Sequence, residues 1–162
     1  MDRVASLLDL KSDADRLRQA GVLSDDEMAV LDFEALLAFW QSELGRRIRA
    51  QPARNVHREL PFTARMSPAD LLLLKLPVNE GLPDDEFVVV QGVVDLAVIL
   101  QKEIWLVDFK TDHLREGDLQ EKADFYGPQV KLYGLALSRI YRRNVTESWL
   151  HFLSPGQTRP VR

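Results

Sequence analysis

Two apolar segments separated by only two residues constrain the fold of this chain more than any other feature. The first runs from Phe87 to Leu100 (FVVVQGVVDLAVIL) and the second from Glu103 to Thr111 (EIWLVDFKT). β-Branched residues are dense in both, and a connection as short as residues 101–102 favours two neighbouring strands in a tight hairpin. Because the apolar residues show little alternation, we expect this part of the sheet to be covered on both faces.

Helices are predicted ahead of the hairpin. The segment SDDE at residues 24–27 fits a helix-capping box, with the Ser24 hydroxyl at the N-cap. Apolar residues then recur at helical spacing, and Gly45 interrupts the pattern. The stripe is typical of core packing, and its members are Phe33, Leu36, Leu37, Trp40, Leu44 and Ile48.

The remaining segments alternate between strand and helix signals. Residues 55–62 favour a strand, Ser67 before Pro68 favours the start of a short helix, and residues 76–86 have the composition of a loop. Residues 117–143 regain helical spacing, with a break expected near Gly127–Pro128. Residues 145–153 favour a last strand, and residues 154–162 a loose tail.

These elements predict an α/β fold with a mixed β-sheet of about four to five strands flanked by helices. At 162 residues, the chain is expected to form one domain over 1–162. Within it we expect a helical N-terminal segment over residues 1–50 and an α/β core over residues 54–153.

Composition excludes several classes of function. The chain has no cysteine, which excludes disulfides, thiolate catalysis, zinc fingers and cysteine-held iron–sulfur clusters. No apolar run approaches the roughly 20 residues that span a bilayer, and the N-terminus lacks a secretory signal pattern. We therefore expect a cytoplasmic protein. A net charge of −4 does not indicate a generally basic nucleic-acid-binding surface, so phosphate contacts would depend on local groups such as Arg139, Arg142 and Arg143.

An acid and a lysine two residues apart end the second strand of the hairpin. Chance alone gives about one acid–x–Lys triplet in a chain of this composition, and a second one, Asp9–Leu10–Lys11, lies in a polar stretch. Asp108 and Lys110 differ in context, because they close an apolar strand and point to the same side of it. Buried charges at such a place require pairing or a metal ion.

The hairpin also brings a second acid to this place. Counted from the turn, Asp95 and Asp108 are equally distant and fall opposite each other. Two facing carboxylates repel unless a cation or a proton lies between them, and oxygen ligands without Cys favour Mg²⁺ or Mn²⁺. A buried Asp–Lys ion pair with Asp95 as an ordinary strand-end acid fits the spacing equally well, so both interpretations stay open.

Further along, Gln129 and Tyr133 lie four residues apart on one helical face. Their polar tips could reach the strand ends or a nucleic-acid backbone. Taken alone, the pattern is more typical of an amphipathic helix with an ordinary glutamine and a half-buried tyrosine.

Together, GVVD, VDFKTD and QVKLY resemble the G-x-x-D, D-x-K and Q-x-x-x-Y motifs of RecB-like nucleases of the PD-(D/E)XK superfamily. Two upstream segments, LSDDEMAVLDFEALLAFWQSELGRR and VHRELPF, resemble the segment that leads into the nuclease core of AddA-type helicase–nuclease subunits. In those subunits the nuclease core lies at the C-terminus. The resemblance implies a restriction-endonuclease-like core that hydrolyses DNA phosphodiesters with Mg²⁺ or Mn²⁺, as an exonuclease in DNA repair and recombination.

The resemblance also implies roles for individual residues. Metal ligands would be Asp95, Asp108 and the backbone carbonyl of Phe109, and Lys110 would be the catalytic lysine. Glu59, in RELPF, matches a glutamate of the pattern and is a further catalytic candidate. Residues that contact DNA or support the site would be Gln129, Tyr133, Tyr126 and Asp112.

Two departures from the family pattern affect the expected partners. No G-x-x-x-x-G-K-[ST] phosphate loop occurs, so ATP-driven helicase activity would belong to a domain or partner subunit outside this chain. The family has a metal-binding histidine on an upstream helix, and in this chain the register places Asp2 at that position. His57 lies in a strand, so we do not take it as a replacement for that histidine. A nuclease-fold module that holds DNA or a helicase partner without cutting is therefore the alternative, and a Mg²⁺-dependent phosphohydrolase of small nucleotides is a third.

Overall fold

The computed structural model describes residues 6–74, 87–112, 114 and 117–161, and divides the chain into two compact units, residues 1–53 and 54–162. Each unit is described by itself, and their folding as the single domain expected stays a prediction. The predicted loop over residues 76–86 and the position of Asp2 lie outside the described residues.

The first unit is helical. Its helices are α1 (Leu7–Gln19), α2 (Asp25–Ala29), α3 (Phe33–Gln41) and α4 (Glu43–Arg49), followed by a short 3-10 turn η1 (Ala53–Asn55). The predicted capping box at Ser24 begins α2. Asp9 closes a capping box with Ser6 at the start of α1, so the acid of the second acid–x–Lys triplet serves to begin a helix.

The apolar stripe of the first unit is broken at Ser42 rather than at Gly45. The Ser42 hydroxyl donates to the carbonyl of Phe39 at 2.6 Å and accepts from the N–H of Gly45 at 3.1 Å. One side chain thus ends α3 and begins α4. Gly45 lies inside α4, where a Cβ atom would meet the Phe39 carbonyl oxygen, so glycine permits the tight approach of the two helices.

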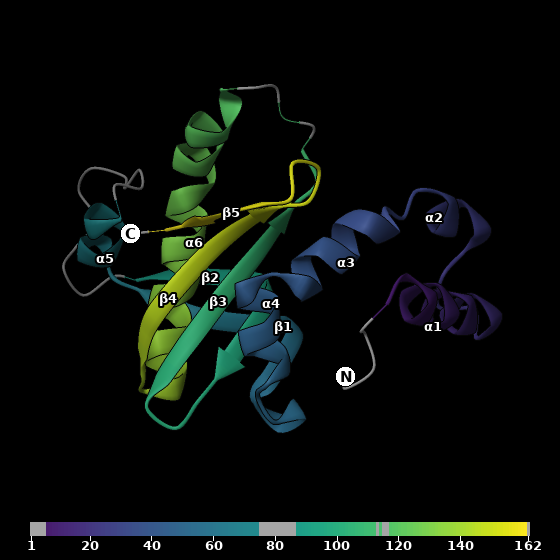
Figure 1. Cartoon of the computed structure of the whole chain (residues 1–162). Coiled ribbons are helices and arrows are strands. Elements are labelled where there is room, and N and C mark those ends of the chain that lie inside the picture. Colours follow the sequence, from purple (N-terminus) through teal and green to yellow (C-terminus); the bar gives the residue numbers. More distant parts are fainter. Residues whose placement is uncertain (1–5, 75–86, 113, 115–116, 162) are drawn as a thin grey trace. The chain divides into compact units, whose positions relative to one another are not determined.

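The second unit is a five-stranded mixed sheet with helices, which confirms the predicted α/β class (Figure 1). Its elements are β1 (Val56–Met66), α5 (Pro68–Leu73), β2 (Val88–Ile99), β3 (Glu103–Lys110), α6 (Asp118–Tyr141), β4 (Asn144–Phe152) and β5 (Gln157–Pro160). Among the residues that the structure describes, the strand order is β1-β2-β3-β4-β5, and only the β3–β4 pair, which α6 connects, is parallel. None of the described helices is both long and apolar enough to cross a membrane.

Two expectations about the C-terminal half were wrong. The segment after β4 is not loose, because a turn with Gly156 at φ +61° returns the chain to pair with β4 as β5. Helix α6 is not broken at Pro128 but continues through it. Proline removes one hydrogen bond from the helix, and the burial of Val130, Ala136 and Leu137 on the same helix offsets that loss.

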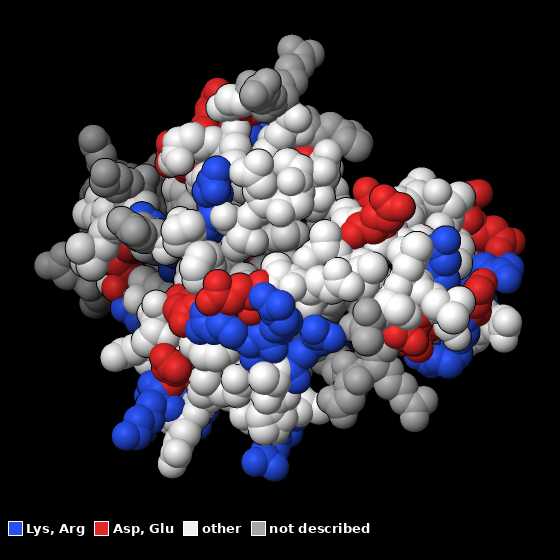
Figure 2. All heavy atoms as spheres, viewed as in Figure 1, with Lys and Arg blue, Asp and Glu red and all other residues white. Residues whose placement is uncertain are grey.

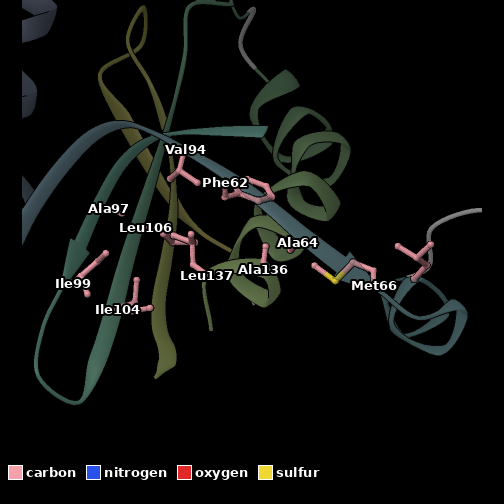
Figure 3. Close-up of a cluster of buried hydrophobic side chains, with 11 residues drawn as sticks. Phe62, Ala64, Met66, Val94, Ala97, Ile99, Ile104, Leu106, Ala136 and Leu137 are labelled. Carbon is pink, nitrogen blue, oxygen red and sulfur yellow. The ribbon is translucent and has the colours of Figure 1, made fainter. Parts of the chain in front are cut away.

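One apolar cluster fastens α6 to the sheet. Strands β1, β2 and β3 and helix α6 supply side chains that point toward one another in Figure 3. Leu106 and Leu137 are each 1% exposed, and burial of such a side chain contributes about 1.5–3 kcal/mol. The cluster comprises Phe62, Ala64, Met66, Leu71, Val94, Ala97, Ile99, Ile104, Leu106, Ala136 and Leu137. It holds one face of α6 against the strands that carry the two acids of the hairpin.

The hairpin itself is confirmed, but its coverage is uneven. In β3, five consecutive residues from Ile104 to Asp108 are buried, as are residues 96–99 of β2. The first half of β2 departs from the expectation of two covered faces, since Val89 and Val93 are 53% and 44% exposed. β-Branched density identified the strand correctly and overestimated its burial.

At Asp95, strand β2 changes which of its side chains point toward the apolar cluster. Val90 and Val94 pack against the apolar cluster, and beyond Asp95 the cluster residues are Ala97 and Ile99. Such a change of parity requires an irregular backbone, because strand side chains otherwise alternate strictly. In the β1–β2 register, Glu59 is the residue opposite Asp95, between the pairs Arg58–Leu96 and Leu60–Val94, and it has a left-handed φ of 46°.

Helix α5 is held to α6 by an ion pair. The predicted cap Ser67 begins α5, and Asp70 completes its capping box. The Asp70 carboxylate also accepts from Arg139 at 2.5 Å, so this arginine is engaged within the fold. The Arg139 guanidinium, together with the Ser67 hydroxyl and N–H, lowers the pKa of Asp70 from 3.8 to about 2.

This ion pair predicts a pH-dependent contribution to stability. Because the folded-state pKa of Asp70 is depressed, its contribution is complete above about pH 4 and is lost as pH falls toward 2. We expect Arg139→Met to lower the free energy of unfolding by about 1 kcal/mol at pH 7, since partial exposure of the arginine screens the pair. In urea unfolding, the difference from wild type should shrink between pH 4 and pH 2, while the exposed Arg142→Gln should match wild type throughout. A difference that stays constant with pH would contradict the assignment.

Candidate active site

The ends of β2 and β3 bring two acids and a lysine together. The β2–β3 ladder ends at the pair Leu96–Val107, and the same register continues to Asp95 opposite Asp108. The Oδ2 atom of Asp95 accepts a hydrogen bond from the N–H of Phe109, the residue after Asp108 in β3, at 2.7 Å. Asp95 is therefore fixed beside Asp108, just beyond the last pair of the β2–β3 ladder.

Lys110 connects this pair of acids to helix α6. Its Nζ atom lies 2.7 Å from Oδ2 of Asp108 and donates to Oε1 of Gln129 at 3.2 Å. The amide nitrogen of Gln129 donates in turn to the hydroxyl of Tyr133 at 2.9 Å. The structure thus joins the D-x-K and Q-x-x-x-Y segments in one continuous hydrogen-bonded chain, which the four-residue spacing on α6 makes possible.

The electrostatics of the site are dominated by burial of Asp108, which is 4% exposed. Burial raises the pKa of Asp108, the ion pair with Lys110 opposes that rise, and the negative charge of Asp95 adds to it. Burial also raises the pKa of Tyr133, with Gln129 opposing and Asp108 adding. Lys110 therefore compensates the buried charge of Asp108 only in part, and a further positive charge would stabilise that carboxylate.

An aromatic ring with polar partners of its own supports Lys110. The ammonium lies 4.3 Å from the centre of the Tyr126 ring, within cation–π range. The Tyr126 hydroxyl donates to Asp112 at 3.0 Å, and Lys122 forms an ion pair with the same carboxylate at 2.9 Å. That ion pair lowers the pKa of Asp112. Tyr126 and Asp112 thus lie beside the site, and Lys122 holds them in place. Sequence reasoning missed Lys122, although its spacing of four residues from Tyr126 could have indicated that the two side chains are neighbours.

Gly92 provides room for Tyr133. A Cβ atom at this position would lie 2.9 Å from the Phe62 ring and 3.1 Å from the Tyr133 ring. These two rings themselves pack edge to face with centroids 5.3 Å apart. The glycine of the G-x-x-D segment therefore lets the last residue of the Q-x-x-x-Y segment lie directly on the sheet.

In the described part of the chain, Glu59 does not form a metal-holding group with the other acids. Its register position is in the same row as Asp95 and Asp108, but its side chain is exposed and its backbone is left-handed. Over residues 6–74, 87–112, 114 and 117–161, no group of three or more His, Cys, Asp or Glu side chains is gathered as a metal site. Alternation along β1 placed Glu59 on a face of the strand, and the irregular backbone at that residue could not be read from the sequence.

The donor set nevertheless fits a hard divalent cation. Mg²⁺ commonly takes one or two carboxylates and fills its other positions with water and substrate oxygens. Asp95 and Asp108 supply such a pair, with the Phe109 carbonyl between Asp108 and Lys110 in sequence. The negative charge of Asp108 is incompletely compensated, and a bound cation would stabilise it.

Comparison with known proteins shows the family. The profile of the PD-(D/E)XK nuclease superfamily matches residues 2–160, so the chain belongs to this superfamily. Its relatives include proteins named as the A subunit of an ATP-dependent helicase/nuclease. That of Geobacillus kaustophilus is 34% identical over 91% of this chain, and that of Clostridium kluyveri is 30% identical over 95%. The chain spans only 12% of the length of either relative.

The close packing at Gly92 gives a testable pair of glycine variants. We expect Gly92→Ala to destabilise the fold by about 1–3 kcal/mol, because the added methyl group displaces the Phe62 and Tyr133 rings. Gly134 lies in α6, and in Gly134→Ala, by contrast, the methyl group meets side-chain atoms of Leu106 and Val145 no closer than 3.7 Å. That variant should be neutral or stabilised by up to about 1 kcal/mol. Chemical denaturation of both variants measures the difference, and equal stabilities would contradict the packing described.

Proposed function

We propose that this chain is a metal-dependent deoxyribonuclease module that hydrolyses phosphodiester bonds, acting as an exonuclease within a DNA repair and recombination helicase–nuclease. Membership of the PD-(D/E)XK nuclease superfamily supports the reaction class. The observation that carries the proposal is the convergence of Asp95, Asp108 and Lys110 at one end of the hairpin, linked to Gln129 and Tyr133 on α6.

In this proposal Asp95, Asp108 and the backbone carbonyl of Phe109 hold the ion, which is Mg²⁺ or Mn²⁺. When bound, such an ion neutralises charge on a phosphoryl oxygen and makes a bound water more acidic. The hydrogen bond from Phe109 N–H fixes the orientation of the Asp95 carboxylate toward the end of β3. That arrangement costs little reorganisation when the ion enters, because one carboxylate is already held in place.

Lys110 supplies the positive charge of the chain's own site. Its ammonium has three hydrogens, and two of its directions are taken by Asp108 and Gln129. A third is available for a phosphoryl oxygen or a water, and the Tyr126 ring limits the positions that the ammonium samples. Because Asp108 and Gln129 hold it from two elements, the lysine is oriented before substrate arrives.

The partners of this chain can be inferred by analogy with its relatives. Each relative named above belongs to a helicase/nuclease and is about eight times longer than its matched segment. We infer that DNA is the substrate and that helicase activity comes from a domain or a partner subunit outside this chain, in the cytoplasm. On the face in view in Figure 2, basic and acidic side chains lie beside one another, so local contacts rather than overall charge would hold DNA.

A second candidate function rests on the small number of acids in the site. Both carboxylates already have partners, Asp95 through Phe109 N–H and Asp108 through Lys110. Within the described part of the chain no third acid joins them. A nuclease fold that holds DNA or a helicase partner without hydrolysis is consistent with this, and Glu59 would then have no role in catalysis.

The nuclease proposal predicts a sharp difference between two lysines. We expect Lys110→Gln and Asp108→Asn to lower the rate of DNA cleavage by at least about 100-fold, because each removes charge from the site. Lys11→Gln, in the other acid–x–Lys triplet, should cleave like wild type. Cleavage of a labelled oligonucleotide in the presence of Mg²⁺ measures all three. Wild-type rates in Lys110→Gln would rule out the assigned role, provided circular dichroism shows folded protein.

Metal binding separates the enzyme from the non-enzymatic module. We expect calorimetric titration with Mn²⁺ to show binding in the millimolar range or tighter, since two carboxylates and a carbonyl provide few ligands. Asp95→Asn should weaken that binding at least about tenfold, because it removes a charged ligand. Asp13→Asn, on the exposed surface of α1, is the matched control and should bind as wild type does. Absence of binding to the wild-type chain would favour the module.

A further inference from the structure

An exposed aromatic ring lies next to the candidate active site. Phe125 on α6 is 72% exposed, although phenylalanine is among the residues that most often lie inside a protein. It precedes Gln129 by four residues and follows Lys122 by three, so it shares the helix face that carries the site. A large apolar ring that is exposed on a polar face, beside reacting groups, can stack against a flat ligand.

Two contacts in series limit the distance from this ring to the catalytic lysine. The Phe125 and Tyr126 rings pack edge to face with centroids 5.1 Å apart, and Lys110 Nζ lies 4.3 Å from the Tyr126 centroid. The Phe125 centroid is therefore at most 9.4 Å from the ammonium, by addition of 5.1 and 4.3 Å. A phosphate at Lys110 and a base at Phe125 can belong to the same or adjacent nucleotides.

The inner ring of this pair is held firmly. The Tyr126 hydroxyl donates to Asp112 at 3.0 Å, and the Asp112 carboxylate is also paired with Lys122 at 2.9 Å. Phe125 thus packs against a ring that has polar anchors at its far end. A surface supported in this way loses little conformational entropy when a ligand stacks on it.

We propose that Phe125 is a stacking surface for a nucleobase of the DNA strand whose phosphate lies at Lys110. The proposal rests on the proposed nuclease function for the identity of the strand. In an intact duplex both faces of each base are stacked on its neighbours, whereas an unpaired base offers a free face to an aromatic side chain. Every base has such a face, so the contact selects unpaired DNA without selecting a sequence.

The experiment measures DNA binding in the full chain with Asp108→Asn as background, which removes cleavage. Fluorescence anisotropy with a single-stranded oligothymidylate is compared between this background, Phe125→Leu and Phe125→Trp. We expect Phe125→Leu to weaken binding at least about fivefold and Phe125→Trp to restore it, because indole provides a larger stacking surface. Phe87→Leu is the matched control, since Phe87 is also exposed but packs over Arg65; it should leave binding unchanged.

A second oligonucleotide tests whether the base is what Phe125 contacts. With an abasic strand of the same length, Phe125→Leu and its background should bind equally. Equal binding of oligothymidylate by Phe125→Leu and its background would overturn the proposal, and so would an equal loss on the abasic strand. Failure of the nuclease proposal looks different. A wild-type chain that binds oligothymidylate through Phe125 but does not cleave it would support stacking and reject the enzyme.

Discussion

The structure depends on the way in which two neighbouring acids are accommodated at one end of a buried hairpin. Asp95 and Asp108 face each other where β2 and β3 stop exchanging backbone hydrogen bonds. The fold provides two groups for them, the N–H of Phe109 and the ammonium of Lys110. Lys110 does not fully compensate the charge of Asp108, because burial still raises the pKa of that carboxyl group. A stable apolar core thus surrounds a place where charge remains uncompensated.

Helix α6 supplies the remaining residues of the site. Its apolar face packs on β1, β2 and β3, and its polar face carries Gln129, Tyr133, Tyr126 and Lys122 to the lysine and its neighbours. The same packing therefore fixes both the fold and the position of Lys110. Gly92 is the point at which the two requirements meet, because only a residue without a side chain lets Tyr133 approach the sheet so closely.

Much of this arrangement could be predicted from local rules. A two-residue turn determines the hairpin register, so simple counting placed Asp95 opposite Asp108, and spacing of four residues placed Gln129 and Tyr133 on one helix face. Ser24 and Ser67 act as N-caps because their hydroxyls satisfy free N–H groups at the start of a helix. The roles of these site residues in metal binding and catalysis stay predictions.

The features that sequence reasoning missed depend on tertiary effects. Residues 157–160 form β5 because β4 offers a free edge, and α6 tolerates Pro128 because the burial of its own apolar side chains compensates a lost hydrogen bond. The sequence RELPF does not predict the left-handed backbone of Glu59, which lies opposite the point where β2 changes the side chains that it directs toward the apolar cluster. Lys122 and Phe125 belong to no motif; the spacing of Lys122 from Tyr126 was a weak signal, and the fold shows that both residues lie beside the site.

Diffraction from crystals soaked in Mn²⁺, with anomalous scattering to identify the ion, tests the central claim most directly. We expect a single strong peak bound by carboxylate oxygens of both Asp95 and Asp108, with Lys110 beside the ion and outside its coordination shell. A peak at other acids, or carboxylates that keep their present partners at saturating Mn²⁺ with no ion between them, would contradict this claim.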